Sequence, residues 1–253
     1  MDTTRYLARI NYAGDLTPSV ATLGGLQEAH LLTIPFENLD IHLGEKIVLD
    51  IDRFYRKIVE NGRGGFCYEL NGLFHSLLRS VGFDARMVSA RVYDGNLGKY
   101  GPEFDHLAIL VDIDDDTWLT DVGFGDFTMR PLRFVLNALQ ADRNGQFLIE
   151  NHDSQYVRVS KYSTEEAIFV PQYIFTTREQ VLDDFTEMCT YQQTSSESYF
   201  KRKRLCSLAT THGRITLTDD KVITTEGGNR TEFPITNSQE FAHVLKQYFG
   251  VNV

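Results

Sequence analysis

The chain has 253 residues and a net charge of −10, with 42% hydrophobic and 24% charged residues. This composition supplies enough apolar material for a globular core without a disulfide framework. The acidic balance argues against a general nucleic-acid binder, because a phosphate backbone requires a basic face. An anionic cofactor is still compatible, since a helix N-terminus or a nest of backbone N–H groups can hold phosphate in an acidic protein.

The first third of the chain has the apolar spacing of α-helices. Thr17 and Pro18 match the cap and the first position of a helix whose apolar residues recur through Leu31. A second apolar stripe covers residues 51–59 and stops at Asn61-Gly62, and a third covers residues 66–81. We therefore expect the chain to begin with packed helices.

The middle of the chain changes to strand-like patterns. The strongest lie at residues 85–93, 107–111 and 117–120, and the run from Asp112 to Asp116 supplies a turn between the last two. Further strands are predicted at residues 147–149, 156–160, 167–170, 214–217 and 222–225, followed by a helix over residues 241–248. These segments predict an α+β fold with boundaries near residues 84 and 190.

Residues 63–71, Arg-Gly-Gly-Phe-Cys-Tyr-Glu-Leu-Asn, place Cys67 at the start of an amphipathic helix behind a Gly-Gly pair. The helix dipole and the unpaired backbone N–H groups there favour a reactive thiolate and can bind an oxyanion. The two glycines remove side chains where an acyl group would approach. The alternative interpretation is a buried, unreactive cysteine beside a turn.

A thiolate nucleophile needs a base, and the base needs an orienting group. His106 stands at the head of the strand over residues 107–111, and Asp121 stands at the tail of the next strand. If the two strands pair as a hairpin, the two residues become neighbours, and a bond from the histidine Nδ1–H to the carboxylate is expected. The alternatives are a strand-edge histidine and a turn carboxylate.

Other candidate residues carry weaker signals. We expect structural roles for Cys189 and Cys206, a capping or packing role for His30, and partial exposure for His75. The basic run at residues 201–204 is interpreted as a solvated charged segment, with contact to nucleotide phosphates as the alternative.

The sequence also carries expectations about metals and location. Its three cysteines are widely spaced, without a CxxC pair or zinc-finger histidines, so we expect no metal site and no disulfide framework. The N-terminus has no signal-peptide pattern, and no apolar run reaches about 18 residues. Free thiols without a leader predict a cytoplasmic protein.

Five motifs together resemble the arylamine N-acetyltransferase family. They are residues 34–39 (Ile-Pro-Phe-Glu-Asn-Leu), 63–71, 105–107 (Asp-His-Leu), 121–125 (Asp-Val-Gly-Phe-Gly) and 205–210 (Leu-Cys-Ser-Leu-Ala-Thr). They follow in order from residue 34 and cover most of the chain. The end at Val253, soon after the last predicted helix, resembles the shorter prokaryotic members.

The resemblance implies a fold in three parts around a cysteine-protease-like catalytic core. These are a helical bundle over residues 1–83 that carries the nucleophile, a β-barrel over residues 84–190, and an α/β lid over residues 191–253. It also implies acetyl-CoA as donor, a small arylamine or arylhydrazine as acceptor, and a ping-pong mechanism through an acetyl-cysteine. Neither a metal, a nucleic acid nor a membrane is an expected partner, and the protein is expected to act as a monomer or homodimer.

The resemblance also assigns roles to residues. Cys67 would carry the acetyl group, His106 would form an ion pair with it, and Asp121 would orient His106. The acceptor pocket would contain Phe124 and Phe36, and the coenzyme contacts would include Gly123, Gly125 and Thr210. The chain departs from the family where relatives often have Ser-Pro-x-Ser-x-Phe, because it has Ser-Ser-Glu-Ser-Tyr-Phe at residues 195–200.

Two other functions fit the same triad. A transglutaminase-like acyltransferase or a cysteine protease also has the chain order Cys, His, Asp, and only the flanking motifs at residues 34–39 and 122–125 separate them from an acetyltransferase. A binding module that keeps the fold without the activity is the second alternative. An ordinary thiol that reacts only near pH ~8.5 would indicate it.

Overall fold

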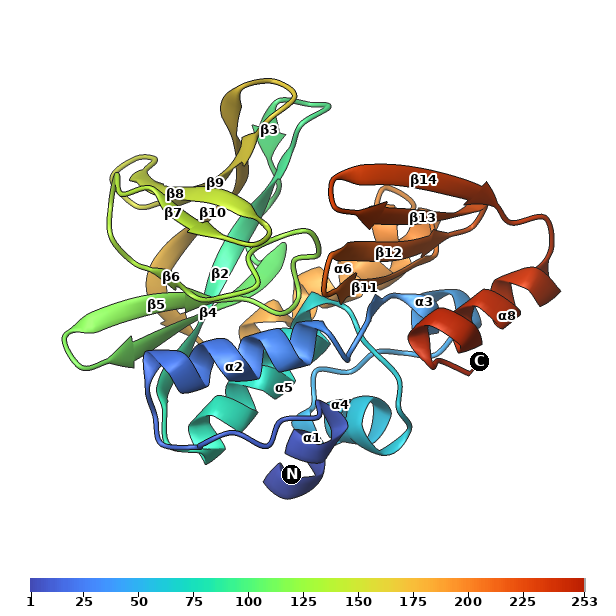
Figure 1. Ribbon diagram of the computed structural model, residues 1–253, viewed down its shortest axis with the longest axis horizontal. Coiled ribbons are helices and arrows are strands. Elements are labelled where there is room, and N and C mark those ends of the chain that lie inside the picture. The colour runs from blue at the N-terminus through green and yellow to red at the C-terminus, as the bar shows by residue number, and fades with distance from the viewer. Residues whose placement is uncertain (253) are drawn as a thin grey trace.

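The computed structural model describes residues 1–252, and it divides them into a helical part, a large sheet and a smaller sheet. Figure 1 shows helices α2 and α5 beneath the strands of the large sheet, with the smaller sheet beside them. The helices of the first part are α1 (Thr3–Arg9), α2 (Val20–Leu31), α3 (Leu39–Leu43), α4 (Ile51–Tyr55) and α5 (Cys67–Ser80). The predicted α+β class with its N-terminal helices is therefore confirmed.

Helix α2 begins two residues later than its sequence pattern indicates. Its cap is Ser19, whose hydroxyl accepts a hydrogen bond from the backbone N–H of Thr22 at 3.1 Å. Thr17 instead contributes its carbonyl, which accepts from the Thr22 hydroxyl at 2.8 Å. The prediction of Thr17 as cap is wrong because the serine that follows Pro18 can reach an unpaired N–H of the first turn.

The predicted helix over residues 51–59 changes its pitch halfway. After α4 the chain continues as a wider π-helical turn, η1 (Arg56–Glu60), and the reversal at Gly62 has a positive φ of +68°. The wider turn carries Lys57, which faces carboxylates on three other segments. Such π turns often lie at functional sites. This one contacts the first turn of α5, where Lys57 pairs with Glu69.

Within residues 1–252 the large sheet has nine strands and forms a nearly closed barrel (Figure 1). The order is β6-β5-β4-β2-β10-β9-β8-β7, and β3 pairs with β2. The bounds are β2 (Asp84–Asp94), β3 (Lys99–Tyr100), β4 (His106–Ile113), β5 (Asp116–Thr120), β6 (Leu132–Arg133), β7 (Gln140–Asp142), β8 (Gly145–Asn151), β9 (Val157–Ser163) and β10 (Ile168–Gln180). All the strands predicted between residues 85 and 170 overlap strands of this barrel.

Strand β4 is buried on both faces, which explains its continuous apolar run. Leu107, Ile109 and Val111 pack with the helical part, where the apolar stripe of α5 meets them. Ala108 and Leu110 point to the opposite face and join the barrel core. Side chains alternate along a strand, so His106 shares the barrel-core face.

The smaller sheet joins the two ends of the chain. Its order is β1-β11-β12-β13-β14, and β1 pairs antiparallel with β11. The bounds are β1 (Phe36–Glu37), β11 (Leu205–Thr210), β12 (Gly213–Thr218), β13 (Lys221–Glu226) and β14 (Asn229–Pro234), and α8 (Ser238–Phe249) packs against β11 and β12. Because β1 comes from the helical part, the two motifs at residues 34–39 and 205–210 lie side by side. The division at residues 84 and 190 stays a prediction.

A short helical segment connects the barrel to the smaller sheet. It consists of η2 (Leu182–Phe185), α6 (Thr186–Thr194) and α7 (Tyr199–Arg202). The Asn38 amide fastens this segment to the helical part by donating to the carbonyls of Phe200 and Lys203 at 2.9 and 2.7 Å. Helix α7 is therefore held beside β1.

Candidate active site

Cys67 is the first residue of α5, as the sequence predicts, and it is buried. The N-terminus of the helix is capped by a residue of its own first turn, because the Glu69 carboxylate accepts a hydrogen bond from the backbone N–H of Phe66 at 3.1 Å. A side chain on Gly64 would collide with the carbonyl of Pro35, and one on Gly65 would collide with Glu69. The glycine pair thus permits close packing against β1, whereas the sequence pattern indicates room for an acyl group.

His106 and Asp121 come together as the hairpin geometry predicts. Strands β4 and β5 pair with Ile109 opposite Thr120, and Asp121 directly follows that pair. The ring and the carboxylate meet at 2.7 Å, with both side chains buried. The ring nitrogen is Nε2, so the expected Nδ1 contact is wrong. This arrangement leaves Nδ1 as the nitrogen available to Cys67.

The Asp121 carboxylate is surrounded by hydrogen-bond donors. Oδ1 accepts from the amide of Asn71 at 2.8 Å and from the backbone N–H of Gly123 at 2.9 Å. Oδ2 accepts from His106 at 2.7 Å and from the Tyr173 hydroxyl at 3.2 Å. Four hydrogen bonds, three of them from other segments of the chain, hold this buried carboxylate in position beside His106.

Asn71 is a positioning residue that the sequence interpretation missed. Besides Asp121, its amide donates to the carbonyl of Leu107 at 2.6 Å, and its oxygen accepts from the N–H of Val122 at 2.9 Å. It therefore ties α5 to the strands that carry the other two residues. The available signal was its spacing, because a residue four positions after Cys67 lies on the same helix face.

The thiol of Cys67 is not stabilised as a free thiolate. Burial raises its pKa, the carboxylates of Asp105 and Asp121 raise it further, and the backbone N–H of Tyr68 lowers it. The backbone N–H at the helix start thus acts in the predicted direction, but burial and the two carboxylates act against it. In such a site, ionisation is favoured only when the proton moves to His106, so that thiolate and imidazolium form as a pair.

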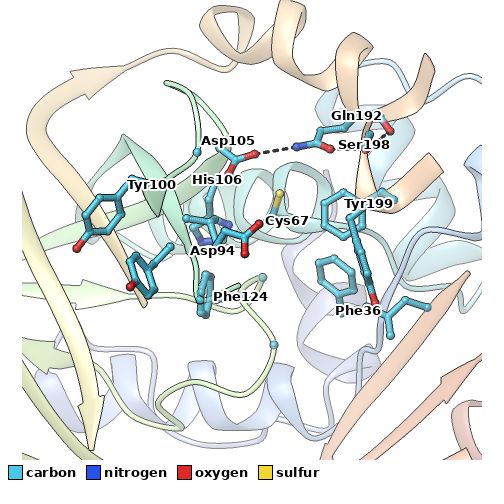
Figure 2. A pocket seen from close by; sticks show the side chains of 18 of the residues that line it. Phe36, Cys67, Asp94, Tyr100, Asp105, His106, Phe124, Gln192, Ser198 and Tyr199 are labelled. Atoms are coloured by element: carbon cyan, nitrogen blue, oxygen red, sulfur yellow. Dashed lines mark hydrogen bonds between the residues drawn. The ribbon is translucent and has the colours of Figure 1, made fainter. Parts of the chain in front are cut away.

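Cys67 and His106 line a cavity of about 900 Å³. Figure 2 shows the Cys67 sulfur between Phe124 and His106 on one side and Phe36 and Tyr199 on the other. One wall comes from the loop between β2 and β3, and the opposite wall comes from α7 and β11. The size suits a small organic molecule together with part of a larger one.

The two predicted pocket residues both line this cavity. The ring of Phe124 lies edge-on to His106 at a centroid distance of 5.2 Å and to Tyr173 at 5.0 Å. Phe36 packs on Phe200 of α7 at 5.7 Å. Together they give the cavity apolar surfaces near Cys67, on which a planar ring can pack.

The three predicted coenzyme contacts lie in different places. Gly123 and Gly125 line the cavity, and a side chain on Gly123 would come within 2.9 Å of the Cys67 Cα. Gly125 has a φ of +101°, and its carbonyl accepts from Arg214. Thr210 pairs with Gly213 at the end of β11, and the cavity wall, as the described residues define it, does not include it.

The weaker candidates take structural positions. Cys189 and Cys206 are buried and unpaired, and the Cys189 sulfur contacts the Gln193 amide at 3.2 Å. His30 is buried against Tyr6, with its pKa lowered to about 3 by burial. His75 is partly buried, and its Nε2 lies 3.0 Å from the carbonyl of Ala85. Arg204, the last residue of the basic run, stacks on Phe241 at 4.0 Å and pairs with Asp219.

Residues 1–252 contain neither a metal-ligand cluster nor a membrane-spanning helix. No group of three or more His, Cys, Asp or Glu side chains in that range could hold a metal ion. No helix within the described part of the chain is long and apolar enough to cross a membrane.

A buried cluster of ion pairs supports the start of α5. It joins three carboxylates to two cations, with the closest nitrogen–oxygen distances at 2.8–2.9 Å: Glu37, Asp40, Lys57, Arg63 and Glu69. The cluster connects β1, α3 and η1 to the helix that carries Cys67. With carboxylates in excess, burial and the neighbouring Glu37 and Asp40 raise the pKa of Glu69 to about 7, although Lys57 opposes the shift.

We expect Glu69→Gln to change how stability depends on pH. A raised carboxyl pKa means that the folded state binds the proton more tightly, so the contribution of Glu69 to wild-type stability falls as the pH rises from about 4.5 to about 7. The variant has no carboxyl at this position, so this decrease in the free energy of unfolding is absent. For a pKa shift of that size, the decrease amounts to about 3 kcal/mol. Urea unfolding of both proteins between pH 4.5 and 7.5 measures it. Parallel stability curves would contradict the expectation.

Comparisons with known proteins agree with the geometry. The sequence model of the N-acetyltransferase family matches residues 19–253. The chain is 31% identical to the arylamine N-acetyltransferase pineal gland isozyme NAT-10 of Gallus gallus, with 100% of this chain and 95% of that protein aligned. It is also 31% identical to the arylamine N-acetyltransferase of Escherichia coli, over 98% of this chain and 88% of the other.

Solved structures show the same similarity. The arylamine N-acetyltransferase of M. tuberculosis superposes with a TM-score of 0.93 at 28% identity, covering 100% of this chain and 94% of the other. The enzyme from Salmonella typhimurium gives 0.91 at 28% identity, covering 98% and 90%. With matching motifs, fold and sequence over nearly its whole length, the chain belongs to the arylamine N-acetyltransferase family.

Proposed function

We propose that this protein transfers the acetyl group of acetyl-CoA to the nitrogen of an arylamine or arylhydrazine, by a ping-pong mechanism through acetyl-Cys67. The observation that carries the proposal is the buried set of Cys67, His106 and Asp121, which opens on one cavity with apolar walls. Each residue alone fits other roles, but the three together in this family fit a covalent acyl transfer.

In the first half-reaction, His106 accepts the thiol proton at Nδ1 while the Cys67 sulfur attacks the carbonyl carbon of the thioester. Asp121 stabilises the resulting imidazolium through its 2.7 Å contact with Nε2. The tetrahedral intermediate collapses by breaking the bond to the CoA sulfur, and the proton on His106 leaves with that thiolate. Because this half-reaction exchanges one thioester for another, its free-energy change is small.

In the second half-reaction, the amine attacks the acetyl-enzyme and His106 removes a proton from the nitrogen. An arylamine suits this step because it is neutral at pH 7, whereas an alkylamine is mostly protonated. Phe124 and Phe36 lie beside Cys67 on the cavity wall and fit the flat face of an aromatic ring.

Two cationic side chains of the cavity lining are available to an anionic coenzyme, although the lining also contains Asp94 and Glu197. Lys99 on β3 and Arg202 on α7 line the cavity, and no carboxylate within residues 1–252 forms an ion pair with either. We propose that Gly123 and Gly125 border the pantetheine arm, and that Thr210 meets a part of the coenzyme that extends past the cavity along β11.

The acceptor is a small molecule, and a net charge of −10 does not favour a nucleic acid as partner. Free thiols at Cys67, Cys189 and Cys206 fit the reducing cytoplasm, where we place the protein as a monomer or homodimer.

Intact mass spectrometry tests the proposed function. Incubation with acetyl-CoA alone should add the mass of one acetyl group, and subsequent addition of an arylamine should remove it. Cys67→Ala should stay unmodified under the same conditions. An adduct that persists in Cys67→Ala, or none in the wild type, would refute the proposal. Turnover of a glutamine peptide without acetyl-CoA would favour an amide-cleaving enzyme instead.

A further inference from the structure

A second carboxylate lies beside the nucleophile, and the Cys67–His106–Asp121 mechanism does not use it. Asp105 directly precedes His106, lines the cavity and is largely buried (Figure 2). Its charge is close enough to Cys67 to raise the thiol pKa more than Asp121 does. For the attack on acetyl-CoA, such a charge is unfavourable, because the attacking sulfur is itself an anion.

The carboxylate of Asp105 is held in place by its surroundings. Oδ1 accepts a hydrogen bond from the Gln192 amide of α6 at 2.8 Å, and the Gln192 oxygen in turn lies 2.6 Å from the Ser198 hydroxyl. Oδ2 lies against Gly101, where any side chain would collide with it. A buried charge fixed in this way costs folding stability unless it interacts with a partner. No cation within residues 1–252 forms an ion pair with this carboxylate.

The charge of the reacting centre differs between the two half-reactions. In the first, negative charge develops at sulfur, so a neighbouring carboxylate opposes the attack. In the second, the sulfur of Cys67 is a neutral thioester and the attacking nitrogen becomes positive as its lone pair forms the C–N bond. The same carboxylate then stabilises the transition state for addition of the amine, which precedes the departure of the Cys67 sulfur as an anion.

We propose that Asp105 is a catalytic residue of the amine half-reaction and accepts a hydrogen bond from the attacking nitrogen. This inference rests on the proposed function. The primary amine has two N–H bonds. One proton passes to Nδ1 of His106, and the other N–H donates to Asp105 and is retained in the amide product. The C–S bond breaks, and the Cys67 sulfur leaves as a thiolate that takes the proton back from His106. Acceptors are therefore selected for a nitrogen with two N–H bonds.

The test measures the two half-reactions separately in wild type and Asp105→Asn, which keeps the shape and removes the charge. The release of CoA after mixing with acetyl-CoA reports the first step, and isolated acetyl-enzyme mixed with 4-anisidine reports the second. We expect the first step to be unchanged or faster and the second to slow by roughly 10- to 100-fold, as for a lost hydrogen bond to a charged group. The pH at which Cys67 becomes alkylated should also decrease.

Two further variants keep the result interpretable. Gly101→Ala displaces the same carboxylate without removing it and should also slow only the amine step. Asp84→Asn removes an exposed carboxylate at the far end of β2 and should change neither step. Equal slowing of both steps, or an amine step unaffected in Asp105→Asn, would overturn the role of Asp105. A wild type that forms no acetyl-enzyme would instead contradict the proposed function.

Discussion

Cys67→Ser is expected to reduce arylamine acetylation by about 10⁴-fold or more, with the fold intact. The serine hydroxyl is far less acidic than the thiol, and the burial that already raises the Cys67 pKa acts on it in the same direction. Any acetyl-serine that formed would be an ester, which is less reactive toward an amine than a thioester. Steady-state kinetics with acetyl-CoA and an arylamine measure the loss, and urea unfolding checks the fold.

The matched control is Cys189→Ser, which changes another buried free thiol. Its side chain contacts the Gln193 amide at 3.2 Å, a contact that a hydroxyl can keep. Activity should remain within about threefold of wild type, since surroundings that accept the new group limit the effect. If both variants lost activity equally, the loss would come from burying a serine hydroxyl in the fold. The assignment of Cys67 as nucleophile would then fail.

Asp121→Asn is expected to lower the rate by about 10⁴-fold, comparable to the loss of the orienting carboxylate in a serine protease triad. An asparagine amide facing Nε2 would donate to the ring, which moves the ring proton to Nδ1 and removes the base that Cys67 needs. The amide also cannot accept all the bonds that Asp121 receives from His106, Asn71 and Tyr173. The free energy of unfolding should therefore also decrease, by about 1–3 kcal/mol.

Kinetics of Asp121→Asn over pH 6–9 check this prediction, with Asp116→Asn as control at the opposite end of β5. Asp116 is partly exposed and pairs with Arg133, and exposed pairs of this kind contribute at most about 1 kcal/mol. Its replacement should leave activity unchanged. An Asp121→Asn variant that keeps a tenth of wild-type activity would show that the ring is oriented by other contacts.

Local patterns in the sequence were sufficient for the elements that carry the triad. Helix α5 and the hairpin of β4 and β5 depend on neighbouring residues: an apolar stripe of period 3.6, a run buried on both faces, and a turn rich in aspartate. Antiparallel pairing brings the head of one strand beside the tail of the next, so the sequence alone is enough to place His106 and Asp121 together. The acetyl donor and amine acceptor came from the family resemblance, since a triad alone does not name its substrate.

Only the tertiary structure decided how the triad is held and which residues surround it. The choice of Nε2, the bonds from Asn71 and the carboxylate of Asp105 all depend on segments brought together across 15 to 87 positions of the chain. The same holds for the Gly-Gly pair, which the sequence pattern links to a substrate and the structure links to the carbonyl of Pro35. Local propensity acts within a turn or a strand, whereas these contacts arise from packing one element on another. The sequence by itself therefore predicted a nucleophile and its two partners, and the packing of α5, β1 and the barrel decided how these three side chains are held.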